Sequence, residues 1–303
     1  MLVLVLLSTY NGERYLKEQI DSILAQEGVG VHILVRDDGS KDRTCEILEE
    51  YDMQHDNVDV VRADNVGFVK SFSKLVEMAQ KYKDLVDYYA FSDQDDVWMP
   101  HKLKTACDCL SKMNQDKPLL FSSNSVCVDE NLNILKQFHK SKPYRTKENV
   151  MIYPTEQGCS MVFNKKAVEL YNMHSPITSW HDRWMCMICN CFGELYYSHE
   201  ALFYYRIHSS NTLGVRKSLL KTYFDDIFDF FFTTPLNYGM VKEFYDGYKD
   251  KLDAHNNQMV VEYLSYSDSI RQKIKMIFLS KYQYSFAWHR RLRNSLLIIF
   301  NKR

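Results

Sequence analysis

The stretch "DYYAFSDQDDVW" (residues 87–98) joins a short apolar run to three carboxylates within four residues, Asp93, Asp95 and Asp96. Apolar and aromatic side chains flank the acidic group on both sides. Like charges this close cost free energy unless something positive holds them. The stretch therefore predicts either a solvated turn or a group of carboxylates gathered around a cation.

Apolar strands alternate with amphipathic helices on the N-terminal side of this stretch and just beyond it. Strands are expected at residues 2–7, 31–35, 58–62, 87–92 and 118–123, and helices at about 13–26, 42–52, 67–82 and 99–113. This alternation is typical of βαβ units, in which a mostly parallel sheet is covered by helices on both faces. The sequence therefore predicts an α/β fold.

The alternation breaks down after residue 124. A hairpin with a polar turn is expected in "VCVDENLNIL", a basic loop over 136–153, and a strand in "GCSMVFN" (158–164). A short helix is expected over 180–193, followed by a two-stranded return over 194–208. From about residue 216 the pattern is helical to the end.

Composition limits the possible partners and the compartment. The 303 residues are 46% hydrophobic with a formal net charge of -1, which allows a sizeable core and predicts no binding to nucleic acid. The eight cysteines follow no basic, export-type leader, so free thiols in a reducing compartment are expected. Cys186, Cys189 and Cys191 lack a second pair at zinc-site spacing, which favours thiols packed in a buried helix over a metal site.

Polar clusters stand at the carboxyl ends of three predicted strands. They are Ser8, Thr9 and Asn11 after the first, Asp37 and Asp38 after the second, and the acidic group after the fourth. In open α/β sheets ligands bind at that edge, which favours the cation interpretation over the solvated turn. Oxygen ligands suit Mg²⁺ or Mn²⁺, which take remaining ligands from substrate phosphates. Neither a P-loop nor a G-x-G-x-x-G turn is present, so the expected diphosphate is that of a nucleotide sugar.

Seven stretches in this order resemble family-2 glycosyltransferases of the GT-A fold. They are "STYNG", "DDGSKDRT", "NVGFVKSF", "DQDDVW", "GCSMVFN", "HDRWM" and "YRIHSSNTLG", between residues 8 and 214. "DQDDVW", "HDRW" and "YRIH" are more similar to the bacterial rhamnosyltransferase branch. The resemblance implies a nucleotide-diphospho-sugar transferase fold over 1–215, with a nucleotide-binding half (1–100) and an acceptor half (101–215), and a helical, basic extension over 216–303.

The resemblance also implies which residues bind the donor. They are Ser8, Tyr10, Asp38, Lys70, Asp93, Gly158 and Cys159. Asp38 suits reading a pyrimidine imide N–H, because a carboxylate accepts hydrogen bonds and cannot donate them. Asp93 is expected at the ribose or a metal-bound water. For Lys70, a solvated surface lysine is the alternative.

The metal ligands and the catalytic base follow from the same resemblance. Asp95 is expected to be the direct metal ligand, and His208 to reach the metal or the diphosphate, with a structural histidine as the alternative. Asp182 in "HDRW" is expected to be the catalytic base. Arg183 departs from the aromatic residue that relatives often carry there, which affects acceptor specificity rather than the chemistry.

The function expected from this resemblance is metal-dependent, inverting transfer of a hexosyl or rhamnosyl group in the synthesis of bacterial surface polysaccharide. The favoured donor is dTDP-rhamnose and the runner-up is a UDP-hexose. A nucleotidyltransferase is a rival, but "STYNGERYL" has no Gly-rich basic loop. A non-catalytic sugar-binding module is a second rival, against which Asp95, Asp182 and His208 argue.

The C-terminal segment carries a separate signal. After Asp268 come nine Lys and Arg residues and no Asp or Glu. Trp288, Leu292, Leu296 and Ile299 share one helical face, which is typical of a basic amphipathic helix lying in a membrane interface. We expect a cytoplasmic protein that is peripheral on the inner face of the cell membrane and acts on a glycan or lipid-linked glycan. The alternative is that these helices pack on the catalytic domain or form a dimer contact.

Overall fold

A computed structural model describes residues 1–137, 146–152, 154, 156–177, 179–208, 237–265, 271 and 274–275. The chain divides into two compact units. The first consists of residues 1–140 and 156–207, and the second of residues 141–155 and 208–303. The predicted domain boundary between residues 215 and 216 lies outside the described residues and stays a prediction.

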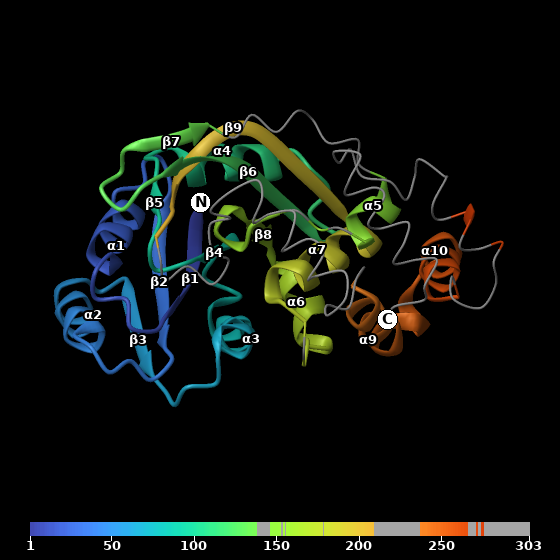
Figure 1. Cartoon of the computed structure of the whole chain (residues 1–303), viewed down its shortest axis with the longest axis horizontal. Helices are drawn as coiled ribbons and strands as arrows, with labels where there is room; N and C mark the ends of the chain where they lie inside the picture. The colour runs from blue at the N-terminus through green and yellow to red at the C-terminus, as the bar shows by residue number, and fades with distance from the viewer. Residues whose placement is uncertain are drawn as a thin grey trace, which may run out of the picture. The chain divides into compact units, whose positions relative to one another are not determined.

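The first unit is built on one curved sheet, and the strands from the N-terminal part of the chain are parallel (Figure 1). Its parallel strands are β1 (Leu2–Thr9), β2 (Gly30–Asp37), β3 (Val58–Arg62) and β4 (Tyr88–Ser92), in the order β3-β2-β1-β4. These strands occur where the apolar runs predicted them. Their carboxyl ends all meet at one edge, so the polar residues that follow β1, β2 and β4 lie near one another.

Beyond β4 the sheet becomes mixed. β8 (Val162–Asn164) runs antiparallel to both β4 and β6 (Leu119–Val128), and β9 (Glu194–Arg206) runs parallel to β6. The short β5 (Val97–Trp98) pairs antiparallel with β9, and β7 (Ile134–Gln137) pairs with β6 as the predicted hairpin. The predicted α/β class is confirmed. Parallel pairing is found among β1, β2, β3 and β4 and between β6 and β9.

Helices cover both faces of the sheet in the first unit. They are α1 (Leu16–Leu24), α2 (Thr44–Gln54), α3 (Phe68–Met78) continued by the 3-10 turn η1 (Ala79–Tyr82), α4 (Lys102–Leu110), α6 (Lys165–Met173) and α7 (His181–Phe192). Alternate side chains of β1 point to opposite faces. Val3 and Val5 therefore pack in the core formed with α1, α2 and α4, and Leu4 and Leu6 are buried on the other face.

Two expectations for the second half of this unit were wrong. Residues 194–206 form one long strand, β9, instead of a two-stranded return. Its register with β6 shifts twice, between Ser122 and Asn124 and between Asn124 and Val126, and these irregularities accommodate the polar stretch without a reversal. The stretch "GCSMVFN" begins as the 3-10 turn η2 (Gly158–Ser160) and becomes a strand only at Val162.

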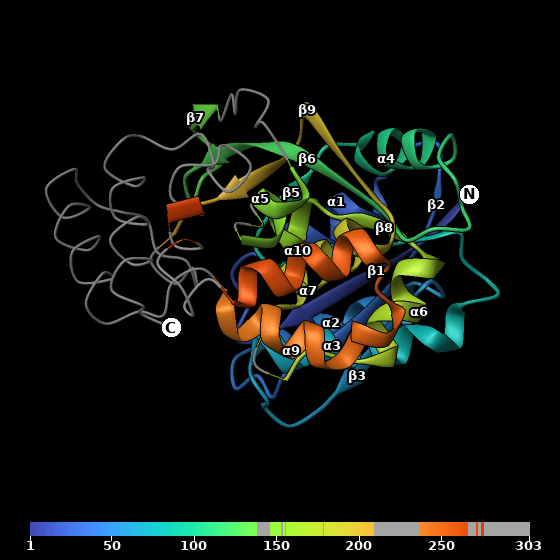
Figure 2. The same ribbon diagram turned by 90° about the vertical axis from the view of Figure 1, so that its right-hand side faces the viewer.

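The second unit is helical where it is described. It contains α5 (Lys147–Ile152), α9 (Tyr238–Tyr248), the 3-10 turn η3 (Lys249–Lys251) and α10 (Ala254–Leu264). Figure 2 shows α9 and α10 side by side, as their contacts require. The helix α5 replaces part of the basic loop expected over 136–153. Crossing a bilayer takes about 20 consecutive apolar residues, and no helix in the described part of the chain combines that length with that hydropathy.

Gly193 connects α7 to β9 at a point where no side chain fits. A Cβ atom there would lie 1.7 Å from the carbonyl oxygen of Pro118, which belongs to the segment leading into β6. The same oxygen accepts a hydrogen bond from the Glu194 N–H at 3.0 Å, so it cannot turn away without losing that bond. The close approach fixes the start of β9 beside β6.

We expect Gly193→Ala to destabilise the chain by about 3 kcal/mol or more, the upper range for inserting an atom into a packed interior. Gly239→Ala is the matched control, because nothing lies within 4 Å of a Cβ at that exposed position in α9. The control should be neutral or stabilise by about 0.5–1 kcal/mol, the helix propensity difference. Urea unfolding of both variants measures this. Equal unfolding midpoints would show that the Pro118 backbone yields easily.

Candidate active site

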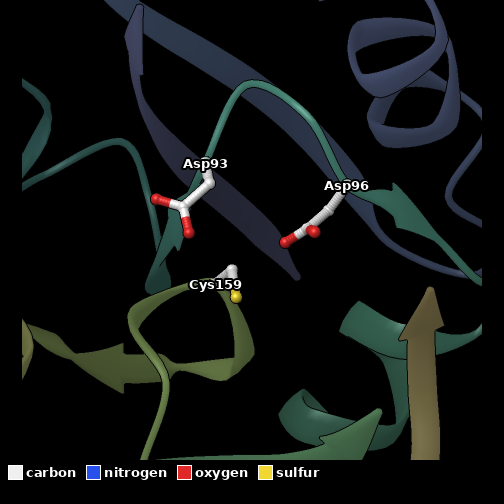
Figure 3. A group of neighbouring side chains, drawn as sticks. All are labelled: Asp93, Asp96 and Cys159. Carbon is white, nitrogen blue, oxygen red and sulfur yellow. The ribbon is translucent and has the colours of Figure 1, made fainter. Parts of the chain in front are cut away.

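The acidic loop follows β4 and leads directly into β5, so it stands at the carboxyl edge of the sheet. Asp93 and Asp95 are half-buried and Asp96 is fully buried. Figure 3 shows the carboxylates of Asp93 and Asp96 converging on the thiol of Cys159, which comes from η2. One ligand atom of each of these three residues lies within 4.8 Å of the others. The solvated-turn interpretation is therefore wrong for Asp96.

The electrostatics of this group are unfavourable in the absence of a cation. Burial, and then the neighbouring charge of Asp95, raises the pKa of Asp93 to about 7. Burial and the charges of Asp95 and Asp93 raise the pKa of Asp96 well above its usual range. Asp96 Oδ1 accepts a hydrogen bond from the Arg206 N–H at 3.1 Å, but Oδ2 accepts none of ordinary geometry from the described residues.

An unsatisfied buried carboxylate oxygen beside two like charges carries a desolvation cost of about 1–3 kcal/mol or more. A divalent cation bound by carboxylate oxygens would offset that cost, and hard oxygen donors are the ligands that Mg²⁺ and Mn²⁺ prefer. The residues present therefore fit such an ion. Asp93 and Asp96 are the side chains of this loop whose oxygens meet near the Cys159 thiol, and the role of Asp95 as direct ligand stays a prediction.

A buried lysine that no sequence pattern indicates lies beside the acidic group. Lys102, the first residue of α4, is fully buried, and its Nζ donates a hydrogen bond to the Cys159 carbonyl oxygen at 2.5 Å. The same Nζ lies 3.3 Å from the centroid of the Trp98 ring. Burial lowers the pKa of Lys102 to about 7, against the charges of Asp96 and Asp93 that favour the ammonium. Nothing in "HKLK" distinguishes it from the exposed Lys104.

The loop after β1 is joined to the acidic loop by Gln94, a second residue that the sequence did not indicate. The Tyr10 N–H donates to Gln94 Oε1 at 2.8 Å, and Gln94 Nε2 donates to the Tyr10 carbonyl at 3.1 Å. The Tyr10 ring itself is 45% exposed and available to a ligand. Ser8, at the end of β1, shares a hydrogen bond of 2.6 Å with the Ser71 hydroxyl of α3.

Asp38, expected to read the nucleobase, is buried at the start of the turn after β2. Its Oδ1 pairs with Arg36 Nη1 at 2.5 Å and accepts from the Val66 N–H at 2.9 Å, while Oδ2 accepts from the Gly67 N–H at 2.8 Å. Asp38 therefore holds the segment before α3 in place. Each carboxylate oxygen can accept more than one hydrogen bond, so reading an imide N–H stays a prediction.

Asp37, at the end of β2, and Lys70, on α3, have different surroundings. Asp37 accepts hydrogen bonds from the Thr9 hydroxyl at 2.9 Å and from the Ser40 N–H at 2.9 Å, so its carboxylate closes the turn. Lys70 is exposed in the first turn of α3. Its role at a base or phosphate stays a prediction beside the alternative of a solvated lysine.

Asp182, the expected base, is the second residue of α7 and is half-buried. Its Oδ1 accepts a hydrogen bond from the Arg183 N–H at 2.7 Å. Burial raises the pKa of Asp182 to about 6, and the backbone hydrogen bond and the Arg183 charge limit that rise. Its charge also contributes to the raised pKa of Asp93, so the two carboxyl groups interact across the site. A carboxylate with this pKa suits a general base at neutral pH.

Gly158 packs against the start of α7, and Cys159 faces the acidic loop. A Cβ atom at Gly158 would lie 2.8 Å from His181 Nε2 and 3.5 Å from Asp182 Cβ, so the start of α7 packs directly on the glycine backbone. The next residue, Cys159, presents its thiol to Asp93 and Asp96. His181 stacks on Phe72 with ring centroids 3.8 Å apart, and burial lowers its pKa to about 3, so it packs there as a neutral ring.

His208 belongs to the second unit, and its expected role at the metal or diphosphate stays a prediction. Within "YRIH", Arg206 contacts the acidic loop, and its backbone N–H donates to Asp96. Nothing in the sequence marks Arg206 as a site residue.

The cysteines are all free thiols, as expected. Cys186, Cys189 and Cys191 are buried in α7, and Cys186 Sγ donates to a carboxylate oxygen of Glu156 at 3.6 Å. These three residues pack as part of the helix.

Comparison with known proteins gives relatives of one kind. Over 125 residues the chain is 38% identical to a dTDP-rhamnosyl transferase, RfbG, of Shigella flexneri, a match that covers 40% of this chain and 41% of the relative's length. An uncharacterized glycosyltransferase of Methanocaldococcus jannaschii is 30% identical over 235 residues, covering 74% of this chain and 77% of the relative.

Solved structures share the fold at low sequence identity. TarS 1–349 of S. aureus in complex with UDP-GlcNAc has a TM-score of 0.60 at 17% identity, covering 100% of this chain and 82% of that one. The mannosyltransferase PcManGT of Pyrobaculum calidifontis, in complex with GDP-Man and Mn²⁺, has a TM-score of 0.55 at 12% identity, covering 99% and 88%. The GT-A-like fold is thereby confirmed. The family model for glycosyl transferase family 2 matches residues 4–169, so the chain belongs to that family.

Proposed function

We propose that the chain is a metal-dependent, inverting glycosyltransferase that moves a sugar from a nucleoside-diphosphate donor to an acceptor hydroxyl. One observation carries the proposal. The turn Gly158–Ser160 brings two carboxylates and the Cys159 thiol, whose ligand atoms lie close enough to share a cation, next to half-buried Asp182, which has a pKa of about 6. A transferase of this kind needs both a cation site for the diphosphate and a base for the acceptor.

The acceptor hydroxyl must lose its proton as its oxygen attacks the anomeric carbon. Asp182 takes that proton as a general base, an effect of about 10²–10⁴-fold in such reactions. The bond from the anomeric carbon to the diphosphate oxygen breaks as the new glycosidic bond forms on the opposite face. A single displacement of this kind inverts the configuration and needs no covalent intermediate on the chain.

The acidic loop serves the leaving group. A bound Mg²⁺ or Mn²⁺ would neutralise the charge that develops on the departing nucleoside diphosphate. Asp95 is our candidate for the direct ligand, and Asp93 for contact with the ribose or a metal-bound water. The Mn²⁺ complex of PcManGT supports this use of the fold.

We favour dTDP-rhamnose as donor, with UDP-hexoses as runner-up. The similarity to RfbG supports the first, and the UDP-GlcNAc complex of TarS supports the second. Thymine and uracil present the same imide group, so Asp38 suits either base. A screen of nucleotide sugars for release of nucleoside diphosphate, with and without candidate acceptors, tests the proposal. A clear preference for purine or cytidine donors would refute the role of Asp38, and no release from any donor would favour the non-catalytic alternative.

We propose that the acceptor is a growing bacterial surface polysaccharide, carried on a lipid at the inner face of the cell membrane. The basic amphipathic segment predicted from Trp288 to Ile299 is the candidate membrane contact, and it lies outside the described residues. Flotation of the full chain with anionic vesicles, at low and high salt, is the measurement that decides this point.

For the metal, we expect Asp95→Ala to abolish transfer while the fold survives. Removing one of three neighbouring like charges relieves repulsion, so thermal stability should be equal or higher. Excess chelator should abolish transfer by the wild type, and added Mn²⁺ should restore it. The matched control is Asp108→Ala, which removes a carboxylate of α4 that is 45% exposed and pairs with Lys104. Full activity in excess chelator would refute the metal dependence.

For the base, we expect Asp182→Asn to lower kcat by about 10²–10⁴-fold with donor affinity nearly unchanged. Because the pKa of Asp182 is about 6, wild-type turnover should rise with pH through that value as the carboxylate deprotonates. The variant should lose that rise. An equal loss of donor binding would instead place Asp182 in the donor site.

A further inference from the structure

We infer that Arg206 is the positioning residue of the acidic loop and that Glu18, on α1, holds Arg206 in place. The inference rests on the proposed function in one respect, that the acidic loop binds a divalent cation. It adds a specific requirement, that the peptide after Asp95 is held by a guanidinium that does not itself bind the cation.

Two hydrogen bonds join Arg206 to the loop. Its Nε donates to the carbonyl oxygen of Asp95 at 2.9 Å, and its backbone N–H donates to Asp96 Oδ1 at 3.1 Å. The first bond fixes the peptide that follows Asp95, and the second uses Oδ1 of Asp96, whose Oδ2 accepts no hydrogen bond of ordinary geometry from the described residues. A ligand is useful only when its direction is fixed, and partners that orient ligands typically contribute about 10–100-fold to metal affinity.

The guanidinium is itself held from three other sides. Nη1 donates to the carbonyl oxygen of Glu130 at 2.7 Å, Nη2 forms an ion pair with the carboxylate of Glu18, and the group lies 4.5 Å from the centroid of the Tyr15 ring. The Arg206 side chain is 1% exposed. This set of contacts uses several donors of a planar fork at once, which the single ammonium of a lysine cannot reproduce.

The charge of Arg206 alone would work against the proposed cation. A guanidinium beside a cation site repels the incoming ion, and burying it is costly unless its donors are satisfied. The positively charged Arg206 therefore benefits the site by orienting the acidic loop and not by attracting the cation. Substitutions that keep the charge but break the contacts separate the two effects.

Glu18 extends the same constraint to the donor side. It lies in the first turn of α1, the helix that follows the Ser8–Gly12 segment. Its side chain is 57% exposed and pairs with the buried guanidinium of Arg206. The ion pair thereby links α1, the end of β9 and the acidic loop, three elements that are distant in sequence.

The experiment compares Arg206→Lys and Glu18→Asp with Glu50→Asp. All three keep the charge, and Glu50→Asp shortens an exposed acid on α2 that pairs with Lys17. Free Mn²⁺ is followed by its electron paramagnetic resonance signal during titration, with dTDP and UDP present in separate runs. Thermal unfolding and kcat are recorded for each variant.

We expect Mn²⁺ to bind about tenfold more weakly to Arg206→Lys, the lower end of the effect of losing an orienting partner. Glu18→Asp should weaken binding in the same direction, and Glu50→Asp should not change it. If Arg206→Lys fails to fold, Glu18→Asp still tests the inference. Glu18 is on the surface, so we expect that variant to fold. The value of kcat should fall together with Mn²⁺ affinity.

Wild-type affinity in both Arg206→Lys and Glu18→Asp would overturn the positioning role and leave the proposed function intact. An equal loss in Glu50→Asp would also overturn it, because the effect would then not depend on contact with Arg206. A wild type that transfers sugar without binding Mn²⁺ or Mg²⁺ would refute the metal dependence and this inference with it.

Discussion

The site depends on one constraint, the placement of three carboxylates at the end of a buried parallel strand. β4 delivers Asp93, Asp95 and Asp96 to the edge of the sheet, where Asp96 is fully buried and one of its oxygens accepts no hydrogen bond of ordinary geometry from the described residues. Around this group the chain places Arg206 on one element and Lys102 on another, both buried. The Lys102 ammonium donates to the Cys159 carbonyl oxygen, and the Arg206 side chain donates to two carbonyl oxygens and to Glu18. These side-chain hydrogen bonds leave the carboxylate oxygens of the acidic loop to a ligand.

The sequence predicted the parts of this arrangement that are local. The first strands and helices follow from apolar periodicity, and the meeting of polar residues at one edge follows from parallel topology. Arg206, Lys102 and Gln94 could not be predicted in the same way, because their roles come from contacts between segments far apart in the chain. In "YRIH" the sequence predicts a role for His208, since histidine is a common metal ligand. It predicts none for Arg206.

The difference between the expected two-stranded return and the single strand β9 has a related physical cause. The polar residues in the middle of "ELYYSHEALFYYR" are typical of a turn when taken alone. In the fold they fall beside two register shifts with β6, where the neighbouring strand tolerates an irregular pairing. Because the chain does not reverse there, β9 continues to Arg206 and delivers it to the acidic loop. The uninterrupted strand therefore places Arg206 next to the acidic loop.

The same constraint determines how stability depends on the ligand. Asp93 has a folded pKa of about 7, raised mainly by burial above the usual carboxyl value of about 3.9. A raised carboxyl pKa means that the folded state binds the proton more tightly than the unfolded state, so this stability is present at low pH and is lost as pH rises from about 4 to about 7. A cation that binds only the folded chain restores stability by mass action. The raised pKa of Asp93 therefore gives the folded chain a cost at neutral pH, and a cation held by the acidic loop would offset that cost.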